Sequence, residues 1–201
     1  MPSAAPPDPL DRVPWPLRTP RLTVARATPA DEDEVWAYRR RDDVGEWLGL
    51  HPVDRADFHE IFSSRLGTGL VVRRDGDLVG DLMLKIGDGW GQREVVADAR
   101  GTQAELGWVL DPAATGHGYA EEALRAVITC CFTRLGLRRI VAHAFADNLR
   151  SRRLMDRLGL RLESHTVAES LHRDHGWVDG VGYALLATEW SLPPATDESG
   201  P

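Results

Sequence analysis

The sequence lacks most of the features that mark membrane, secreted or disulfide-stabilised proteins. Only two of its 201 residues are cysteines, and these are the neighbours Cys130 and Cys131, which cannot easily form an ordinary structural bridge. No uninterrupted apolar run approaches the ~20 residues needed to span a bilayer. The N-terminus has no basic segment followed by an apolar run, so a secretory signal is not expected. These absences predict a reducing, cytoplasmic setting and no membrane association.

Positive charge is in the minority. There are 24 Lys and Arg residues against 31 Asp and Glu, which gives a formal net charge of −7. This balance argues against non-specific nucleic-acid binding and suits a cationic substrate. A composition of 42% hydrophobic and 27% charged residues is ordinary for a globular protein, which excludes mostly disordered, collagen-like and coiled-coil chains. A single domain of this length can bury a substantial core.

Proline is rare in the middle of the chain and concentrated at its ends. Most of the 13 prolines lie within the first 20 residues or after residue 192. Regular structure is not sustained at that density of proline. We therefore predict flexible tails at residues 1–20 and 193–201, around a single domain at residues 21–192.

Hydrophobic periodicity predicts an α/β domain whose strands and helices mix without strict alternation. Asp75-Gly76 between two apolar runs predicts a tight hairpin. The expected architecture is a mixed, twisted sheet of about seven strands flanked by about four helices. The predicted strands are 21–27, 69–73, 78–86, 103–110, 139–145, 160–169 and 177–186, and the predicted helices are 29–41, 54–66, 119–135 and 148–158.

A glycine turn before the long helix is the most informative segment. Gly116 and Gly118 stand where glycine permits a positive φ and keeps side chains off the concave side. Successive backbone N–H groups and the unpaired first turn of the helix then face one cavity, which suits a diphosphate. The Lys-Ser/Thr pair of mononucleotide loops is missing, and Glu121 replaces the third glycine of the dinucleotide fingerprint. A glycine-rich turn without a ligand is the alternative.

The run from Glu105 to Ala120, ELGWVLDPAATGHGYA, resembles motif A of the GNAT superfamily of acyl-CoA N-acyltransferases. The signature Gln/Arg-x-x-Gly-x-Gly/Ala aligns with residues 115–120, and Thr115 replaces the usual Gln or Arg. Residues 146–160 are similar to the family's Asn-x-x-Ser segment. Residues 177–190 and 17–22 resemble the RimJ/RimL-like branch of ribosomal-protein N-terminal acetyltransferases. The resemblance covers about residues 18–190 and implies the GNAT fold.

This resemblance implies transfer of acetyl from acetyl-CoA to a primary amine by direct attack, without a covalent enzyme intermediate. The expected acceptor is a protein or peptide N-terminal α-amine. The alternatives are a small-molecule amine, such as an antibiotic, polyamine or amino acid, and a non-catalytic acyl-CoA-binding module. A homodimer is a family-level expectation, whereas no nucleic-acid, membrane or metal partner is expected.

The resemblance also assigns residues to the cosubstrate. The main chain of Val109, Leu110 and Asp111 is expected along the pantetheine arm, with the Val109 N–H as oxyanion donor. Asn148 is expected to contact the same arm and to cap the helix that follows it. The residues expected to hold the diphosphate are Thr115, Gly116, His117, Gly118, Tyr119 and Ala120.

Two side chains are candidates for the chemistry itself. Glu105 lies in an apolar strand, where burial favours the protonated form of a carboxylate and so makes it a better proton acceptor. A solvent-facing or paired glutamate is the alternative. Ser151 is expected near the thiol in a positioning role, and an ordinary first-turn serine is its alternative. Tyr183 is a weaker candidate for the thiol side, since a packed tyrosine explains it equally well.

Histidines near the C-terminus invite a metal interpretation, but their spacing is irregular and no cysteine is near. The loop 171–176 is therefore expected to border the acceptor pocket instead. Other residues expected to line that pocket are Glu34, Trp36, Trp47 and the loop around Trp90.

Overall fold

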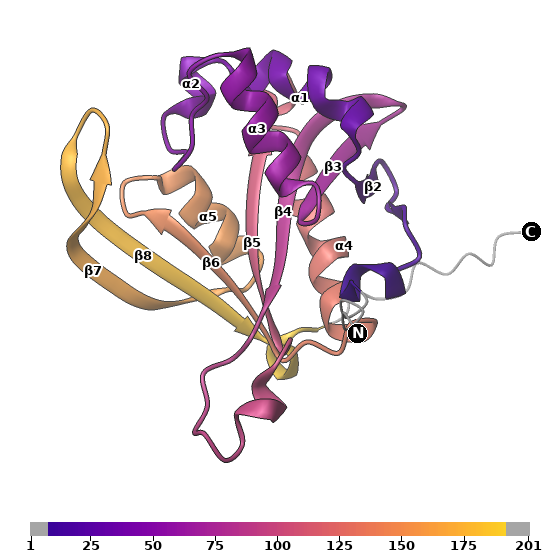
Figure 1. The fold of residues 1–201 in the computed structure, drawn as a ribbon, viewed down its shortest axis with the longest axis vertical. Helices are drawn as coiled ribbons and strands as arrows, with labels where there is room; N and C mark the ends of the chain where they lie inside the picture. Colours follow the sequence, from indigo (N-terminus) through magenta and orange to yellow (C-terminus); the bar gives the residue numbers. More distant parts are fainter. Residues whose placement is uncertain (1–7, 192–201) are drawn as a thin grey trace, which may run out of the picture.

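The computed structural model describes residues 8–191, which form a twisted sheet with helices on both of its faces (Figure 1). The strands are β1 (Leu17–Arg18), β2 (Thr23–Arg26), β3 (Gly69–Arg74), β4 (Asp77–Gly87), β5 (Gln103–Leu110), β6 (Arg139–Phe145), β7 (Arg161–His172) and β8 (Gly176–Leu186). The α-helices are α1 (Glu32–Arg39), α2 (Asp42–Gly45), α3 (Arg55–Arg65), α4 (Tyr119–Thr133) and α5 (Leu149–Arg157). The expected tail at 193–201 and residues 1–7 lie outside the described residues.

The sheet has eight strands in the order β1-β2-β3-β4-β5-β6-β8-β7. Neighbouring strands are antiparallel except β5 and β6, which are parallel. The expected mixed α/β architecture is confirmed. The predicted hairpin is also present, with positive φ at Asp75 and Gly76 between β3 and β4. The additional elements are the two-residue strand β1 and the one-turn helix α2, both too short to give a periodic pattern.

The segment 8–20 differs from the flexible tail that its prolines suggest. It forms a short 3-10 helix at Pro9–Arg12 and then β1, which pairs with β2. Leu10 and Val13 are buried in the main core, and the indole of Trp15 donates a hydrogen bond to the Leu10 carbonyl at 3.0 Å. Apolar residues between the prolines anchor this segment, and proline is well tolerated in the first turn of such a helix.

Two hydrophobic clusters cover the two faces of the sheet. The larger contains the apolar stripe of α4, including Leu124, Val127 and Ile128, which are fully buried as the spacing predicts. The smaller lies beneath α1 and α3 and includes Val109 of β5. Because side chains alternate along a strand, the odd-numbered residues of β5 face α1 and α3, and the even-numbered residues face α4.

The two parallel strands in the middle of the sheet separate after a short contact. They pair only from Gln103 with Arg139 to Glu105 with Val141, although β5 continues to Leu110 and β6 to Phe145. Beyond that point the strands diverge (Figure 1). The open stretch lies directly before the glycine turn and α4, so the sheet itself creates a gap beside the candidate site.

A buried ionic network joins α1 to β4 on the α1/α3 face. The Asp81 carboxylate accepts hydrogen bonds from the Tyr38 hydroxyl and from both Nε (2.9 Å) and Nη2 of Arg39. Arg39 and Asp81 keep only 12% and 15% of their side chains exposed. Burial, together with the negative charge of Asp81, raises the pKa of Tyr38 well above its ordinary value. This network holds α1 against the strand that neighbours β5.

Asp81→Asn is expected to lower the free energy of unfolding by about 3–5 kcal/mol, because it leaves the Arg39 guanidinium buried without its counter-charge. Urea unfolding at pH 7 measures the loss. Asp43→Asn, in the exposed Arg41–Asp43 pair, is the matched control and should leave the midpoint nearly unchanged. Equal, small losses in both variants would contradict the importance of the buried network.

Candidate functional site

The glycine turn and the start of α4 present a row of unused backbone donors. Gly116 and Gly118 have φ values of +83° and +78°, the left-handed conformation that their positions predict. Within residues 8–191, none of the amides from Gly116 to Glu121 donates a hydrogen bond. Gly116, His117 and Gly118 are also exposed. This segment, called the cradle from here on (residues 115–121), can therefore donate several hydrogen bonds to one anion at a helix N-terminus.

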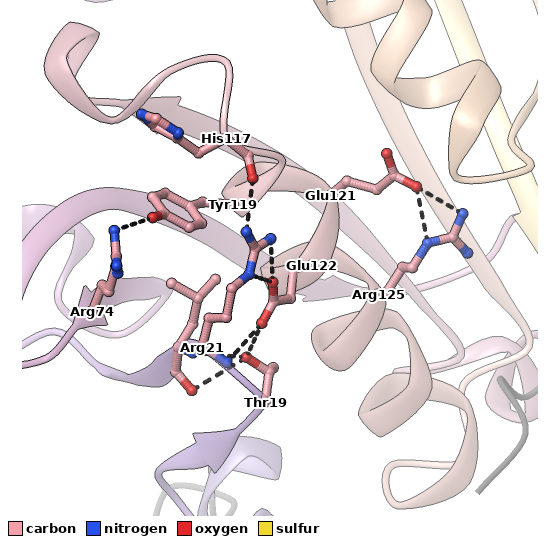
Figure 2. Close-up of polar contacts among 9 residues, drawn as sticks. Thr19, Arg21, Arg74, His117, Tyr119, Glu121, Glu122 and Arg125 are labelled. Carbon is pink, nitrogen blue, oxygen red and sulfur yellow. Dashed lines mark hydrogen bonds and ion pairs between the residues drawn. The ribbon is translucent and has the colours of Figure 1, made fainter. Parts of the chain in front are cut away.

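Polar side chains hold the cradle from its outer side (Figure 2). Arg21 donates from Nη1 to the His117 carbonyl at 3.1 Å and from Nε to Glu122 at 2.7 Å. The other oxygen of Glu122 accepts from the Thr19 hydroxyl at 2.6 Å. Although partial burial alone would raise it, these hydrogen bonds hold the pKa of Glu122 below its ordinary value. The cradle is thus fastened to the N-terminal segment.

The other first-turn side chains of α4 also point away from the cradle amides. Glu121 is paired with Arg125 at 3.0 Å and with Arg157 of α5 at 2.9 Å. The buried Tyr119 ring accepts a hydrogen bond at its hydroxyl from Arg74 at 2.5 Å and lies 4.9 Å from the Arg21 guanidinium. Both carboxylates of this turn are neutralised by arginine, so the helix end keeps its positive character.

The pairing of β5 with β4 shows that the N–H group expected as oxyanion donor does not point toward the gap. The Asp111 N–H donates to the Val79 carbonyl on β4, and Val109 lies opposite Asp81 in the same ladder. Alternate residues of a strand direct their N–H and C=O groups to the same neighbour. The Val109 amide therefore faces β4, not the gap, so it is not directed to serve as the expected oxyanion donor, and the Asp111 amide is likewise bonded to β4.

The amides of the even-numbered residues face the β6 side, and those of Trp108 and Leu110 lie beyond the paired stretch and face the gap. The Thr102 carbonyl, which accepts from the Arg138 N–H at 2.8 Å, confirms that even-numbered residues face the β6 side. Of the three main-chain groups expected along the gap, only Leu110 is suitably directed. Trp108 was missed because strand parity relative to the neighbours is not visible in the sequence.

Glu105 stands at the closed end of the gap. It is half-buried, is the last residue of β5 that pairs with β6, and lies opposite Lys85 on β4. Its side chain shares the α1/α3 face with Gly107 and Val109. Within the described range, its carboxylate has no hydrogen bond or ion pair. The structure thus places Glu105 on one side of the site but not beside its open end.

Asn148 and Ser151 lie at the other wall, just after β6. The Asn148 side chain accepts a hydrogen bond from the Ser151 N–H at 3.1 Å, which caps α5 as the residue type predicts. Both residues are half-buried. Tyr183, in contrast, is buried in the main core with its hydroxyl 3.4 Å from Arg152, so it is a packed tyrosine.

An open cavity of about 290 Å³ lies next to the gap, on the α1/α3 side. Gly180 and Gly182 of β8 form its floor, since they pair with Phe145 and His143 of β6 and lack side chains. A glycine-x-glycine pair in an apolar strand is the sequence signal for such a space. The lining residues are Trp47, Gly49, His143, Ala144, Phe145, Ser164, Thr166, Glu169, Ser170, Gly180, Val181 and Gly182.

The segment after α2, residues 46–48, includes Trp47 of the cavity lining and is held by the tip of the β7–β8 hairpin. The buried His172 accepts from the Asp174 N–H at Nδ1, so its Nε2 donates to the Glu46 carbonyl at 2.7 Å. Arg173 donates to the Leu48 carbonyl, also at 2.7 Å. Trp47 stands between these anchors, with its ring 5.1 Å from that of His172. Trp47 therefore lines the cavity.

Other residues expected around the acceptor pocket lie elsewhere. Trp36 packs on Phe58 at 5.2 Å in the smaller core, and Glu34 pairs with Arg73. Trp90 is 94% exposed in the β4–β5 connection, which extends from the opposite end of the sheet (Figure 1). These three residues do not line the cavity. His165, one of the histidines near the C-terminus, pairs with Asp179 at 2.6 Å.

Several negative findings apply to the part of the chain that the structure describes. Residues 8–191 contain no group of three or more His, Cys, Asp or Glu side chains that could hold a metal ion. Over the same residues, no helix has the length and apolar character needed to cross a membrane. Cys130 and Cys131 are free and buried, and burial raises the pKa of the Cys131 thiol.

Comparison of the sequence with known proteins gives one family. The model of the GNAT acetyltransferase domain matches residues 21–161. The uncharacterized N-acetyltransferase YoaA of Bacillus subtilis is 27% identical over 157 residues, which are 73% of this chain and 83% of YoaA. The uncharacterized N-acetyltransferase YnaD of the same organism is 34% identical over 87 residues, 43% of this chain. That match spans about half of YnaD, 51%.

Solved structures share this fold. An acetyltransferase of the GNAT family from Bacillus anthracis superimposes with a TM-score of 0.73 at 25% identity, covering 87% of this chain and 100% of that one. RimJ from Mycobacterium smegmatis, solved with CoA-disulfide, gives 0.69 at 25% identity and covers 87% of each chain. Spermidine N-acetyltransferase from Vibrio cholerae, solved with CoA and spermine, gives 0.69 at 16% identity, covering 85% and 98%.

The paired Glu122 should make the stability of the chain depend on acidic pH. A carboxylate whose pKa is depressed in the folded state contributes stability above its unfolded pKa of about 4.3, and this contribution is lost as the pH falls through the folded pKa. Glu122→Gln is expected to cost about 1 kcal/mol at pH 7 and progressively less below pH ~4. Urea unfolding from pH 7 to 3 measures this, with the exposed Glu60→Gln as control. Parallel pH profiles for wild type and Glu122→Gln would contradict the assignment.

Proposed function

Because the chain belongs to the GNAT acetyltransferase family, we propose that it is an N-acetyltransferase that moves acetyl from acetyl-CoA to a primary amine. The observation that carries this proposal is the cradle, whose unused amides lie at the N-terminus of α4 and directly beyond the gap between β5 and β6. Its residues fit a diphosphate despite Thr115, because main-chain N–H groups supply the donors.

The gap supplies places for the rest of the cosubstrate. The amides of Trp108 and Leu110 are proposed to bind along the pantetheine and acyl end, with Asn148 on the opposite wall. When bound, acetyl-CoA supplies a thioester carbonyl that is activated toward an amine. A directed amide such as that of Trp108 stabilises the developing oxyanion, and losing one such donor typically costs about 3 kcal/mol. Ser151 is proposed to position the thiol side.

The lining of the cavity favours one acceptor class over another. Among residues 8–191, Glu169 is the single carboxylate that lines it, while Ser164, Thr166 and Ser170 supply hydroxyl groups, and Trp47 and Phe145 supply aromatic walls. A polyamine carries several positive charges and requires several carboxylates, whereas a peptide N-terminus needs hydrogen bonds and room for a side chain. We therefore favour a protein or peptide α-amine. The fold alone does not choose, since solved relatives include both RimJ and a spermidine N-acetyltransferase.

Release of free thiol from acetyl-CoA should be observed with tripeptides that carry a free N-terminus, and should exceed release with spermidine, lysine or an aminoglycoside. The same peptides with acetylated N-termini are the matched controls. Turnover confined to the small amines would show that the acceptor is a small-molecule amine and not a peptide α-amine. No release with either panel, together with tight CoA binding, would identify a non-catalytic acyl-CoA-binding module.

Arg21→Gln is expected to weaken CoA binding about tenfold, because the His117 carbonyl and Glu122 both lose their cation and the cradle is no longer held in place. Isothermal titration calorimetry with CoA measures the dissociation constant. Arg26→Gln is the control, since Arg26 pairs with Asp8 and Asp11 away from the cradle. Unchanged affinity in Arg21→Gln would show that the loop is rigid without this contact.

A further inference from the structure

We infer that His143 of β6, and not Glu105, accepts the proton that the attacking amine must lose. This inference rests on the proposed acetyl transfer and names a catalytic residue for it. The amine attacks in its neutral form and becomes positively charged as its bond to the carbonyl carbon forms, so the site needs an acceptor for that proton at its open end.

The register of the central strands places His143 at that open end. The last paired residues are Glu105 and Val141, so continuing the same register by two residues sets His143 level with Gly107. Both lie on the α1/α3 face, because side chains alternate along each strand. His143 is therefore the first side chain of β6 on this face beyond the point where the strands separate.

Gly107 places no side chain on the α1/α3 face at the level of His143. A Cβ at this glycine would meet only the Met83 side chain, at 3.5 and 3.6 Å. The next residue of β5, Trp108, directs its amide into the same gap. An oxyanion donor and an imidazole therefore stand at neighbouring levels on opposite sides of the opening. This is the arrangement that attack of an amine on a carbonyl requires.

The cavity gives an amine access to the His143 ring. His143 is exposed, lines the cavity, and lies over Gly182, where an added Cβ would come within 3.3 Å of Nδ1 and 2.5 Å of Ser164 Oγ. Neither ring nitrogen has a hydrogen-bond partner among residues 8–191. His165 and His172, in contrast, use their nitrogens to hold the hairpin.

Few other charged groups face this part of the site. Glu169 on β7 lines the cavity, and Glu105 and Lys85 lie on β5 and β4 at the closed end of the gap. Glu105 is two residues further back than His143, beside strands that are still paired. Imidazole is the side chain that ordinarily changes charge nearest neutral pH, which suits it to take and return a proton.

The proposed step balances as follows. The amine nitrogen forms a bond to the carbonyl carbon of the acetyl group, and its proton passes to a ring nitrogen of His143. The carbon–sulfur bond then breaks, and the electron pair leaves with the sulfur of CoA. The imidazolium returns its proton to solvent, and the thiolate takes one up. The products are the amide and free CoA thiol.

His143→Gln is expected to lower kcat at pH 7 by about a hundredfold or more, the usual effect of removing a general base. The tripeptide that wild type uses best serves as acceptor. His165→Gln, on the opposite face of β7, is the matched control and should keep wild-type kcat. His143→Gln should keep the wild-type melting temperature, and both variants should keep the wild-type calorimetric CoA affinity, which separates catalysis from folding. Added imidazole should restore part of the activity of His143→Ala.

The pH profile distinguishes a base from a merely structural residue. At the acidic end, log kcat/KM of wild type should rise with a slope of two, because both the amine and His143 must lose a proton. The slope should be one in His143→Gln and remain two in Glu105→Gln. A slope of two in His143→Gln, or a kcat within threefold of wild type, would overturn the inference while leaving the acetyl transfer intact.

A measurement without turnover completes the test. The imidazole C2–H proton resonance of His143, assigned by its loss in His143→Gln, should shift when the tripeptide is added without acetyl-CoA, whereas the His165 resonance should stay. No shift at saturating peptide would place the acceptor elsewhere and overturn the inference. If wild type releases no thiol with any amine, the proposed function fails, and this inference fails with it.

Discussion

The separation of β5 from β6 is the constraint on which the rest of the site depends. Backbone N–H groups that lose their partner strand need another acceptor, and those of Trp108 and Leu110 face open space instead of β6. The same divergence leaves room at the C-terminal end of β5, where the cradle and α4 begin. If β5 and β6 were hydrogen-bonded along their full length, these N–H groups would have acceptors and the gap would be closed. The site is therefore made by missing sheet hydrogen bonds as much as by any side chain.

Local chemistry explains why much of the fold can be predicted from the sequence. The strands at Gln103–Leu110 and Arg139–Phe145 coincide with their apolar runs, and Gly116 and Gly118 adopt the positive φ that only glycine adopts readily. The stripe on α4 is buried as its spacing requires. The segment 8–20 was not predictable in the same way, because its order comes from Leu10 and Val13 packing on residues that are distant in sequence.

The residues of the candidate site also fall into two groups, those set by local sequence and those set by contacts between distant segments. The cradle is a local feature, so its residues could be read from a short segment. The direction of the Val109 amide depends on how β5 registers with β4, which the sequence does not contain. His143 and Gly182 lie almost 40 residues apart and become neighbours only through the pairing of β6 with β8. Residues of this second kind line the cavity proposed for the acceptor, which explains why the sequence predicts the cosubstrate better than the amine.

The connection between the β7–β8 hairpin and the segment after α2 has a consequence for how such a protein changes over evolutionary time. Two main-chain carbonyls, those of Glu46 and Leu48, are tied to His172 and Arg173 in a turn more than 120 residues away. The segment at the entrance of the proposed acceptor cavity is thus held by a short hairpin turn that has no part in bond making. Small insertions or exchanges there can broaden or narrow the range of accepted molecules, while the machinery at the strand junction is inherited intact.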